Sequence, residues 1–544
     1  MDSFKGFLYI DLPAKLHAAL ANAEGDGDGS GTLISHVTAA IDGWSATGAA
    51  WAVGGAWLLW QLWGYIYNVF FHPCSKFPGP VLFGMSQVPN LYYSWLGTRH
   101  LKVMELHKRY GDAVRIAPAF VSIQTPSAVK ALYETGSRFE KGMFYTRGPI
   151  EKQALISIAS ATEKHVHARK KRLISHAFSD AALRSYEGIL VEKVGLLCRQ
   201  LQDAGSFDGE FKNMSRWFSY LTYDVMGKLV FDHEYNMLTG DDDHFILDVI
   251  DAFQHGQVIL GTVPRIEQWG LAPLLFVKVM SSIMKFRKYV DSQVTQRIAD
   301  EKAGNGSDDI FRLLLNHRDT VTGEHMDFKE LSDEAVVLII AGDHVVASDT
   351  TATALAASCF YFARYPECYR KVQAEVRDAF PSPDDIKNGP KMMGCRYLRA
   401  CVEEALRMCP VVPGHLPRET PVDTLVDGHV VPARAYVGVP GWSMHRHEAY
   451  FPDPTIFRPE RWLEGTDDDI ARLRSVHFPF SKGPRACIGK NLAYNTIYLA
   501  LSRIAQMYDI ESRDPLPLEF HVKDHFAAGG KEGPYLKFTP AVGR

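Results

Sequence analysis

The chain has 544 residues and 46% of them are hydrophobic, so it is long enough to bury a sizeable core. Its net charge is only -4, from 59 Lys and Arg residues against 63 Asp and Glu residues, which gives no indication of nucleic acid as a partner. The eight cysteines form no CxxC pair and are too sparse for a disulfide scaffold, so they fit a reducing compartment.

The first predicted element is an apolar helix, Thr47–Phe71, within a segment from Gly43 to Ser75 that contains no Asp, Glu, Lys or Arg. About 20 apolar residues suffice to cross a bilayer as a helix, so this stretch predicts a transmembrane anchor. It is too long, and too far from Met1, for a cleaved signal peptide. A buried core helix is the alternative.

The charges on the two sides of this stretch predict its orientation. Residues 1–46 carry two lysines against six acidic residues, whereas Lys76, Arg99 and Lys102 follow the stretch. Because the basic side of a membrane helix faces the cytosol, residues 1–46 are expected in the lumen and the bulk of the protein in the cytosol.

A proline-rich hinge, residues 72–80, separates the predicted anchor from the rest of the chain, because its prolines and glycine cannot continue a helix. Residues 81–544 contain no long low-complexity linker and no repeat, which favours one large domain. Helical periodicity dominates residues 155–411, and shorter strand-like runs such as His429–Pro440 come late. The predicted fold class is mainly α with small β-sheets.

One long helix is predicted to begin at an N-cap on Ser332 and to run uninterrupted until Pro366, over roughly 30 residues or ~45 Å. Its apolar sequence contains a compact polar cluster that includes Asp349, Thr350 and Thr351. An acid beside two threonines is costly in apolar surroundings unless it has partners, so the cluster is a functional candidate. The alternative is a helix kink in which a threonine bonds a backbone carbonyl.

A second constellation combines one glutamate and two arginines. Glu404 and Arg407 lie three residues apart and therefore share a helix face. Their apolar neighbours suggest a buried pair that needs a further partner, and Arg461 in an extended, proline-bracketed segment is a candidate. Two arginines and one carboxylate can satisfy one another where a single pair cannot.

The segment FSKGPRACIG, residues 480–489, places the thiol of Cys487 in a short loop rich in glycine. Gly483 and Gly489 would let backbone N–H groups approach the thiolate, and a helix predicted just after the loop would stabilise its charge. A zinc site would need a second Cys or His at ligand spacing from Cys487, and the sequence has none. A catalytic thiol would need a neighbouring histidine, which Cys487 also lacks. Iron in a porphyrin needs only one thiolate from the protein.

These residues resemble the cytochrome P-450 superfamily. The haem-binding signature F-x-x-G-x-R-x-C-x-G of that family is matched at Phe480, Gly483, Arg485, Cys487 and Gly489. The family's E-x-x-R pair is matched by Glu404 and Arg407, its third member by Arg461, and its oxygen-activating segment by SDTTATAL from Ser348. The resemblance covers essentially everything after Lys76. The hinge and the stretch HARKKRLISHAFS, residues 167–179, are similar to microsomal enzymes of filamentous fungi.

The resemblance implies haem b as the cofactor, with Cys487 as its axial ligand and Phe480 shielding the sulfur. Arg485, Arg418 and Lys171 would contact the haem propionates, and Asp349 and Thr350 would deliver protons. It further implies an NADPH-dependent flavoprotein reductase as partner and a place in the endoplasmic reticulum membrane. The loop Pro410–Leu416 would line the substrate pocket.

Two features depart from the family pattern. His167 and Lys171 stand where the family has tryptophan and arginine, so one propionate contact would be a point charge rather than a fork. Five extra residues also separate Ala341–Gly342 from Ser348, which turns that small pair by about 140° from the face of Thr350. A bulge, a shifted helix start and an erroneous gene model are the three explanations.

The sequence therefore predicts a membrane-anchored haem-thiolate monooxygenase that oxidises a lipophilic small molecule, in secondary metabolism, with O2 and electrons from a reductase. One alternative is the same fold catalysing dehydration, isomerisation or oxidative coupling without net oxygen insertion. Another is a non-catalytic haem protein of the membrane, in which Asp349 and Thr350 would have no purpose.

Overall fold

The structure is a computed structural model that describes residues 46–146, 157–203, 209–241, 243–263, 277–305, 309–339 and 348–541. Contacts divide the chain into two compact units, Met1–Phe71 and His72–Arg544. Apart from Ala46, the predicted lumenal segment, residues 1–46, lies outside the described residues.

In the first unit the described residues form one helix, α3, Ala46–Phe70. This confirms a helix over almost all of the predicted stretch. Among the described residues, no helix combines the length and the hydropathy that a membrane crossing needs. With 25 residues, α3 is long enough; its glycines and tryptophans, together with Gln61 and Asn68, reduce its hydropathy.

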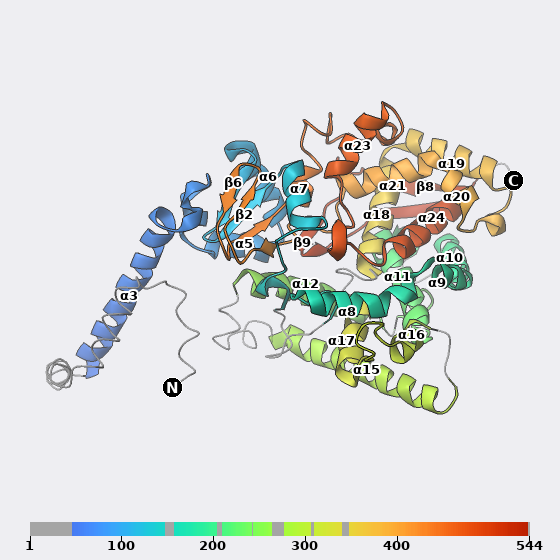
Figure 1. Cartoon of the computed structure of the whole chain (residues 1–544). Coiled ribbons are helices and arrows are strands. Elements are labelled where there is room, and N and C mark those ends of the chain that lie inside the picture. Colours follow the sequence, from blue (N-terminus) through green and yellow to red (C-terminus); the bar gives the residue numbers. More distant parts are fainter. Residues whose placement is uncertain are drawn as a thin grey trace. The chain divides into compact units, whose positions relative to one another are not determined.

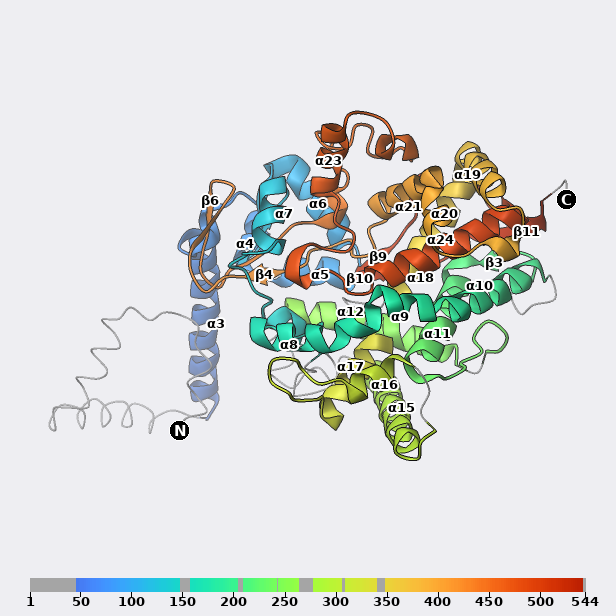
Figure 2. The ribbon, with the colours of Figure 1, turned by 45° about the vertical axis from the view of Figure 1, so that its right-hand side comes forward.

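The second unit is mainly helical, as predicted (Figure 1 and Figure 2). Its α-helices are α4 Val81–Met85, α5 Val88–Trp95, α6 Arg99–Tyr110, α7 Pro126–Tyr133, α8 Lys164–Ser175, α9 Asp180–Ser185, α10 Glu187–Gln202, α11 Met214–Phe231, α12 Phe245–Thr262, α15 Val277–Lys302, α16 Ile310–Asn316, α17 Phe328–Ile339, α18 Ser348–Arg364, α19 Pro366–Ala379, α20 Pro390–Gly394, α21 Arg396–Met408, α22 Gly441–Met444, α23 Asp467–Val476 and α24 Lys490–Met507. Short 3-10 helices are η2 Pro73–Lys76, η3 Met143–Thr146, η4 His176–Phe178, η5 Pro383–Asp385, η6 Pro459–Trp462 and η7 Gly483–Arg485.

The strands form small sheets. They are β1 Ala113–Ala117, β2 Phe120–Ile123, β3 Lys212–Asn213, β4 Arg418–Glu419, β5 Thr424–Val426, β6 His429–Val431, β7 Tyr436–Gly438, β8 Tyr508–Ser512, β9 Lys523–His525, β10 Ala527–Gly529 and β11 Tyr535–Pro540. One sheet has the order β1-β2-β7-β4, a second β3-β11-β8, and β5-β6 and β9-β10 are hairpins. The predicted strand-like run His429–Pro440 is confirmed as β6 and β7.

The predicted hinge packs on the second unit. The N–H of Arg115 on β1 donates to the carbonyl of Pro78 at 2.8 Å. A Cβ on Gly79 would lie 2.5 Å from the carbonyl oxygen of Arg115, so a larger residue at position 79 would collide with the strand. The chain after α3 is thus held against β1.

Helix α18 lies in the helical core, where it packs against α11, α21 and α24 (Figure 2). Its apolar side chains from Ala354 to Phe362 are almost completely buried. These contacts fix the start of α18, and with it Asp349 and Thr350, relative to α21 and α24.

The predicted long helix begins five residues earlier than expected. Helix α17 starts at Phe328, and Asp327 caps it by accepting a hydrogen bond at 2.7 Å from the N–H of Glu330. Ser332 is inside the helix and donates to Asp291 on α15 instead. The five extra residues before Ser348 lie outside the described residues, which resume at α18.

Candidate functional site

The loop that carries Cys487 is folded tightly against α7. Gly483 has a φ of +67°, which favours glycine, and a Cβ there would lie 2.3 Å from the carbonyl oxygen of Tyr133. The N–H of Cys487 donates to the carbonyl of Phe480 at 2.9 Å, which closes the loop. Helix α24 begins three residues later, so its N-terminal dipole favours an anion near the thiol.

Gly489 does not need the conformational freedom that the sequence suggested. Its φ is -82°, a value that any residue adopts, and it precedes α24 as the N-cap. Of the two glycines in the loop, only Gly483 is required by its backbone geometry.

A cavity brings Cys487 and Thr350 together, although they are far apart in the sequence. Its walls include Phe480 and Gly489 from the cysteine loop, and Val411 to Leu416 contribute most of a further wall. The predicted pocket loop therefore lies beside both residues. The other seven cysteines are buried, whereas Cys487 is partly accessible and lines this cavity.

Basic side chains gather at one end of the site and bond mainly to neutral oxygens. Arg485 donates to the carbonyls of Ala161 and, at 2.8 Å, of Thr162. Lys171 donates to the carbonyl of Pro484 at 2.8 Å. Both cations are half-buried, and among the described residues neither forms an ion pair with a carboxylate, the partner that cations removed from water usually have.

Arg418 belongs to the same group of cations. It donates to the hydroxyl of Tyr145 at 2.8 Å and to the carbonyl of Pro417 at 2.9 Å. Its other terminal nitrogen, Nη2, is buried and has no hydrogen-bond partner in the described part of the chain. Such an atom fits a binding site for an anionic oxygen.

The pKa values show how close these cations lie. Burial, together with the charges of Arg485, Lys141, Lys171 and Arg418, lowers the pKa of His167 to about 3. Burial and the charge of Arg418 lower the pKa of Arg485 to about 10. A ligand with two carboxylates would relieve this repulsion between cations. Haem is such a ligand, because it carries two propionates.

On the Cys487 side, Glu404 is fully buried on α21 and surrounded by donors. It accepts hydrogen bonds from Arg407 at 2.9 Å and 2.9 Å, from Arg461 at 3.0 Å, from the N–H of Arg458 at 3.0 Å and from the indole of Trp462 at 2.9 Å. Burial acts to raise its pKa, but the two arginine side chains outweigh burial and lower it. The structure brings the three predicted residues together and adds Trp462.

On the opposite side, Asp349 and Thr350 form the second and third residues of α18. Thr350 lines the cavity. The carboxylate of Asp349 makes an ion pair with Lys531, and its carbonyl accepts from the hydroxyl of Thr353 at 2.8 Å. Residues 340–347 lie outside the described residues.

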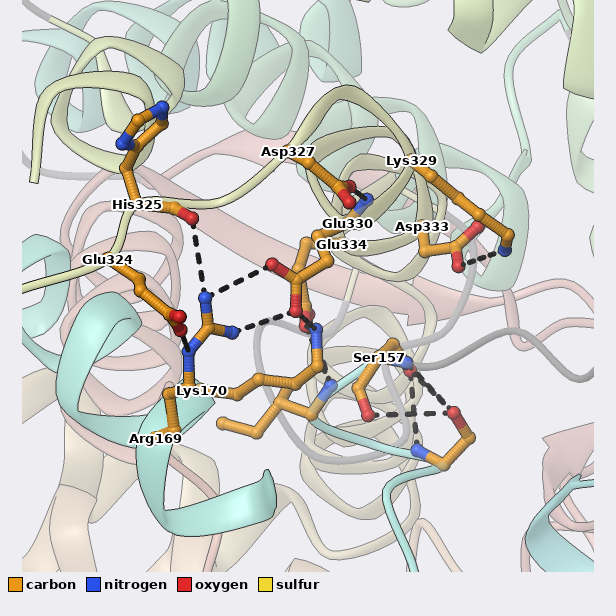
Figure 3. A network of polar contacts seen from close by, with 12 residues as sticks. Ser157, Arg169, Lys170, Glu324, His325, Asp327, Lys329, Glu330, Asp333 and Glu334 are labelled. Atoms are coloured by element: carbon orange, nitrogen blue, oxygen red, sulfur yellow. Dashed lines mark hydrogen bonds and ion pairs between the residues drawn. The ribbon is translucent and has the colours of Figure 1, made fainter. Parts of the chain in front are cut away.

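Helix α17, which precedes those residues, is held by ion pairs to α8. Figure 3 shows Arg169 and Lys170 pointing toward the acidic side chains of α17. Lys170 and Glu334 are both fully buried and approach to 3.0 Å, and Arg169 meets Glu330 at 2.8 Å. Glu334 also accepts the N–H of Ile158 at 2.9 Å. Because Lys171 is the next residue on α8, these pairs tie the cation group to α17.

Sequence reasoning missed Lys141, Tyr145, Trp462 and Lys531. Lys141 donates to the carbonyl of Ala159 at 2.5 Å and lies 4.4 Å from the centre of the Tyr145 ring. No motif marks these residues. Only Trp462 had a signal, because it directly follows Arg461.

Comparison with known proteins decides the family. The cytochrome P450 family model matches residues 76–528. The chain belongs to the cytochrome P450 family. It is 34% identical over 485 residues to the cytochrome P450 monooxygenase poxM of Penicillium oxalicum, covering 88% of this chain and 92% of that protein. It is 33% identical over 512 residues to AKT7 of Alternaria alternata, covering 87% and 94%.

A further relative is more similar but shorter. The monooxygenase ataY of Aspergillus terreus is 63% identical over 211 residues, which are 39% of this chain and 92% of that protein. The chain is thus a cytochrome P450 monooxygenase with fungal homologues over most of its length.

Proposed function

We propose that this cytochrome P450 binds haem b through the thiolate of Cys487 and oxidises a lipophilic small molecule in fungal secondary metabolism. The carrying observation is the cavity that has Cys487 on one wall and Thr350 on another, next to a group of cations. Bound there, the haem would supply activation of O2, which a thiolate ligand favours. The named fungal relatives support the same class of reaction.

The chain's own residues would position the cofactor and the substrate. Arg418, Arg485 and Lys171 would hold the two propionates, with the unpartnered Nη2 of Arg418 as one donor. Val411, Val412 and Leu416 give the cavity an apolar wall, which suits a lipophilic substrate and excludes water from it. Asp349 and Thr350 would pass protons toward the side of the cavity where O2 is reduced.

Electrons would come from a separate NADPH-dependent flavoprotein reductase. A second cavity, of about 1100 Å³, lies on the Cys487 side and shares Phe478–Ser481 with the first. Its lining has more cations than acids: the acids are Asp180, Glu187 and Glu403, and the cations are Arg184, Arg396, Arg399, Arg474, Lys482 and Lys490. Such a lining complements an acidic flavoprotein surface.

The location at the endoplasmic reticulum membrane stays a prediction. It is tested by cell fractionation of the tagged protein with and without residues 1–71. Recovery in the soluble fraction in both cases would contradict it.

The monooxygenase reaction is tested with isotopically labelled O2, the purified haem-loaded enzyme, a reductase and NADPH. Candidate substrates are the small molecules in extracts of cells that express the biosynthetic genes next to the gene for this protein. We expect one labelled oxygen atom in the product. A product that forms with NADPH and O2 consumption but without label would favour dehydration or oxidative coupling instead.

A further inference from the structure

Lys531 makes the ion pair to Asp349 from a distant part of the chain, 182 residues away. Both side chains are largely buried, with 8% of Lys531 and 17% of Asp349 exposed. Lys531 also donates to the carbonyl of Ala528 at 3.2 Å, so its ammonium is held between α18 and the β9–β10 hairpin. A buried ammonium between two oxygens is confined to one position.

The hairpin that delivers Lys531 is itself fixed to the walls of the cavity. The N–H of Ala528 donates at 2.9 Å to the carbonyl of Val411 in the pocket loop. Asp524 is buried and pairs with Arg99 of α6 at 3.0 Å. The position of Lys531 is therefore set by the same loop that lines the substrate cavity.

A carboxylate on α12 holds the other side of the hairpin. Asp251 accepts the N–H of Gly530 at 3.0 Å and the ring Nδ1–H of His525 at 2.9 Å. The charge of Lys531 also acts on Asp251 and on Cys409, the residue that ends α21. In the described part of the chain, the charged and titratable groups shown to interact with Lys531 are thus Asp349 of α18, Asp251 of α12 and Cys409, and His525 of β9 is bonded to Asp251.

We propose that Lys531 is a positioning residue that holds the carboxylate of Asp349 in the orientation from which protons reach Thr350. This inference rests on the proposed roles of Asp349 and Thr350. With Lys531 on Oδ1, the carboxylate cannot rotate freely, and its second oxygen, which has no hydrogen bond recorded among the described residues, is available to water or to Thr350. The lysine acts through Asp349 and does not touch the reacting atoms.

Proton supply can be measured without knowing the substrate. Reduction of O2 by one NADPH consumes two protons in all and releases one H2O2. Reduction by two NADPH consumes four protons in all, breaks the O–O bond and gives two H2O. Because the second route needs further protons inside the cavity, the ratio of H2O2 released to NADPH consumed reports a loss of proton supply.

The test compares Lys531→Met with wild type in the haem-loaded full chain, supplied with reductase and NADPH. We expect the ratio of H2O2 to NADPH to rise by about twofold to tenfold or to its limit of one per NADPH. Lys531→Arg should restore most of the wild-type ratio, because it keeps a donor and a charge.

The matched control is Lys371→Met, which removes a surface pair with Glu460 at 2.6 Å and should leave the ratio unchanged. If Lys531→Met fails to retain haem, Lys531→Gln gives the same test, since its amide can still donate to Ala528.

Thr350→Ala separates the inference from the proposed function. If Thr350→Ala raises the ratio and the Lys531 variants match wild type at every pH, Lys531 has no positioning role, whereas the proton-delivery proposal stands. If Thr350→Ala leaves the ratio unchanged, the proposed roles of Asp349 and Thr350 fail, and the inference fails with them.

Discussion

Two carboxylates on either side of the cavity show how differently this protein holds charge. Glu404 has no exposed surface and receives hydrogen bonds from two arginine side chains, an indole and a backbone N–H. Asp349 is 17% exposed and its carboxylate pairs with one lysine. A carboxylate surrounded by fixed donors maintains architecture, whereas one with a single ionic partner keeps an oxygen free for proton exchange.

Replacing Glu404 should have the largest effect on stability. Glu404→Ala leaves Arg407 and Arg461 buried without their carboxylate, at a cost of about 3–5 kcal/mol. This is a large part of the roughly 5–15 kcal/mol that stabilises a typical domain, so little haem-loaded protein should be recovered. Haem content and urea unfolding measure the effect.

The neighbouring Glu403 provides the matched control for this variant. Among the described residues it accepts a hydrogen bond from Tyr494 at 2.7 Å and lies 3.4 Å from the ring of His477, and Glu403→Gln should cost about 1 kcal/mol. If the Glu403 and Glu404 variants lose equal amounts of unfolding free energy, the hydrogen-bond network around Glu404 adds no more stability than a single hydrogen bond.

Replacing Asp349 should instead lower activity and leave the fold intact. Asp349→Asn keeps the shape of the side chain but removes its ability to exchange protons, so the rate of product formation should fall roughly tenfold or more. The free energy of unfolding should fall by less than the loss of about 3–5 kcal/mol expected for Glu404→Ala, because the amide oxygen of Asp349→Asn can still accept a hydrogen bond from the buried Lys531. An unchanged rate at full haem content would contradict the assignment.

Acid should weaken the parts of the protein that bury neutral histidines. Burial, with smaller contributions from nearby charges, lowers the pKa of His100 and His107 to about 4 and that of His477 to about 3. In the unfolded chain these rings take up protons as the pH falls through about 6.5. Their contribution to stability is therefore complete above that pH and is lost as the pH falls toward the folded pKa.

Between about pH 7 and pH 5.5 each of these histidines should reduce the free energy of unfolding by about 1 kcal/mol. Urea unfolding at the two values measures the sum. His477→Asn should make the curve less steep, since one of the rings no longer titrates, and an equally steep curve would contradict its buried neutral state.

Lys171 should give the smallest effect. Its ammonium already bonds the carbonyl of Pro484, and burial lowers its pKa. Lys171→Arg restores the forked donor that the family pattern has, and should slow haem loss by about twofold. Lys171→Met should speed it. A haem-loss rate that is the same in all three proteins would show that Lys171 does not help to hold the haem propionates.

Local motifs predicted more of the site than of the helix boundaries. The loop 480–489 and the Glu404–Arg407 spacing are short enough to be read directly, because the residues that cooperate are close in sequence. Arg418 with Tyr145, and Asp349 with Lys531, meet only through the tertiary fold.

The wrong helix start has an identifiable physical cause. Asp327 and Glu330 have the spacing of a helix start, but Ser332 followed by two acids has a similar signal. The absence of charge in Thr47–Phe71 predicts a helix that α3 confirms, although among the described residues no helix has the length and hydropathy that a membrane crossing needs.

The most direct test of the account is the absorption spectrum of the reduced protein with CO. Wild type should show the red-shifted band that a thiolate ligand produces, and Cys487→His should bind haem and CO without that band. Loss of the band in the variant, with haem content preserved, would assign the ligand to Cys487. A wild-type protein that binds haem and CO without the red shift, or a variant that keeps it, would contradict the account.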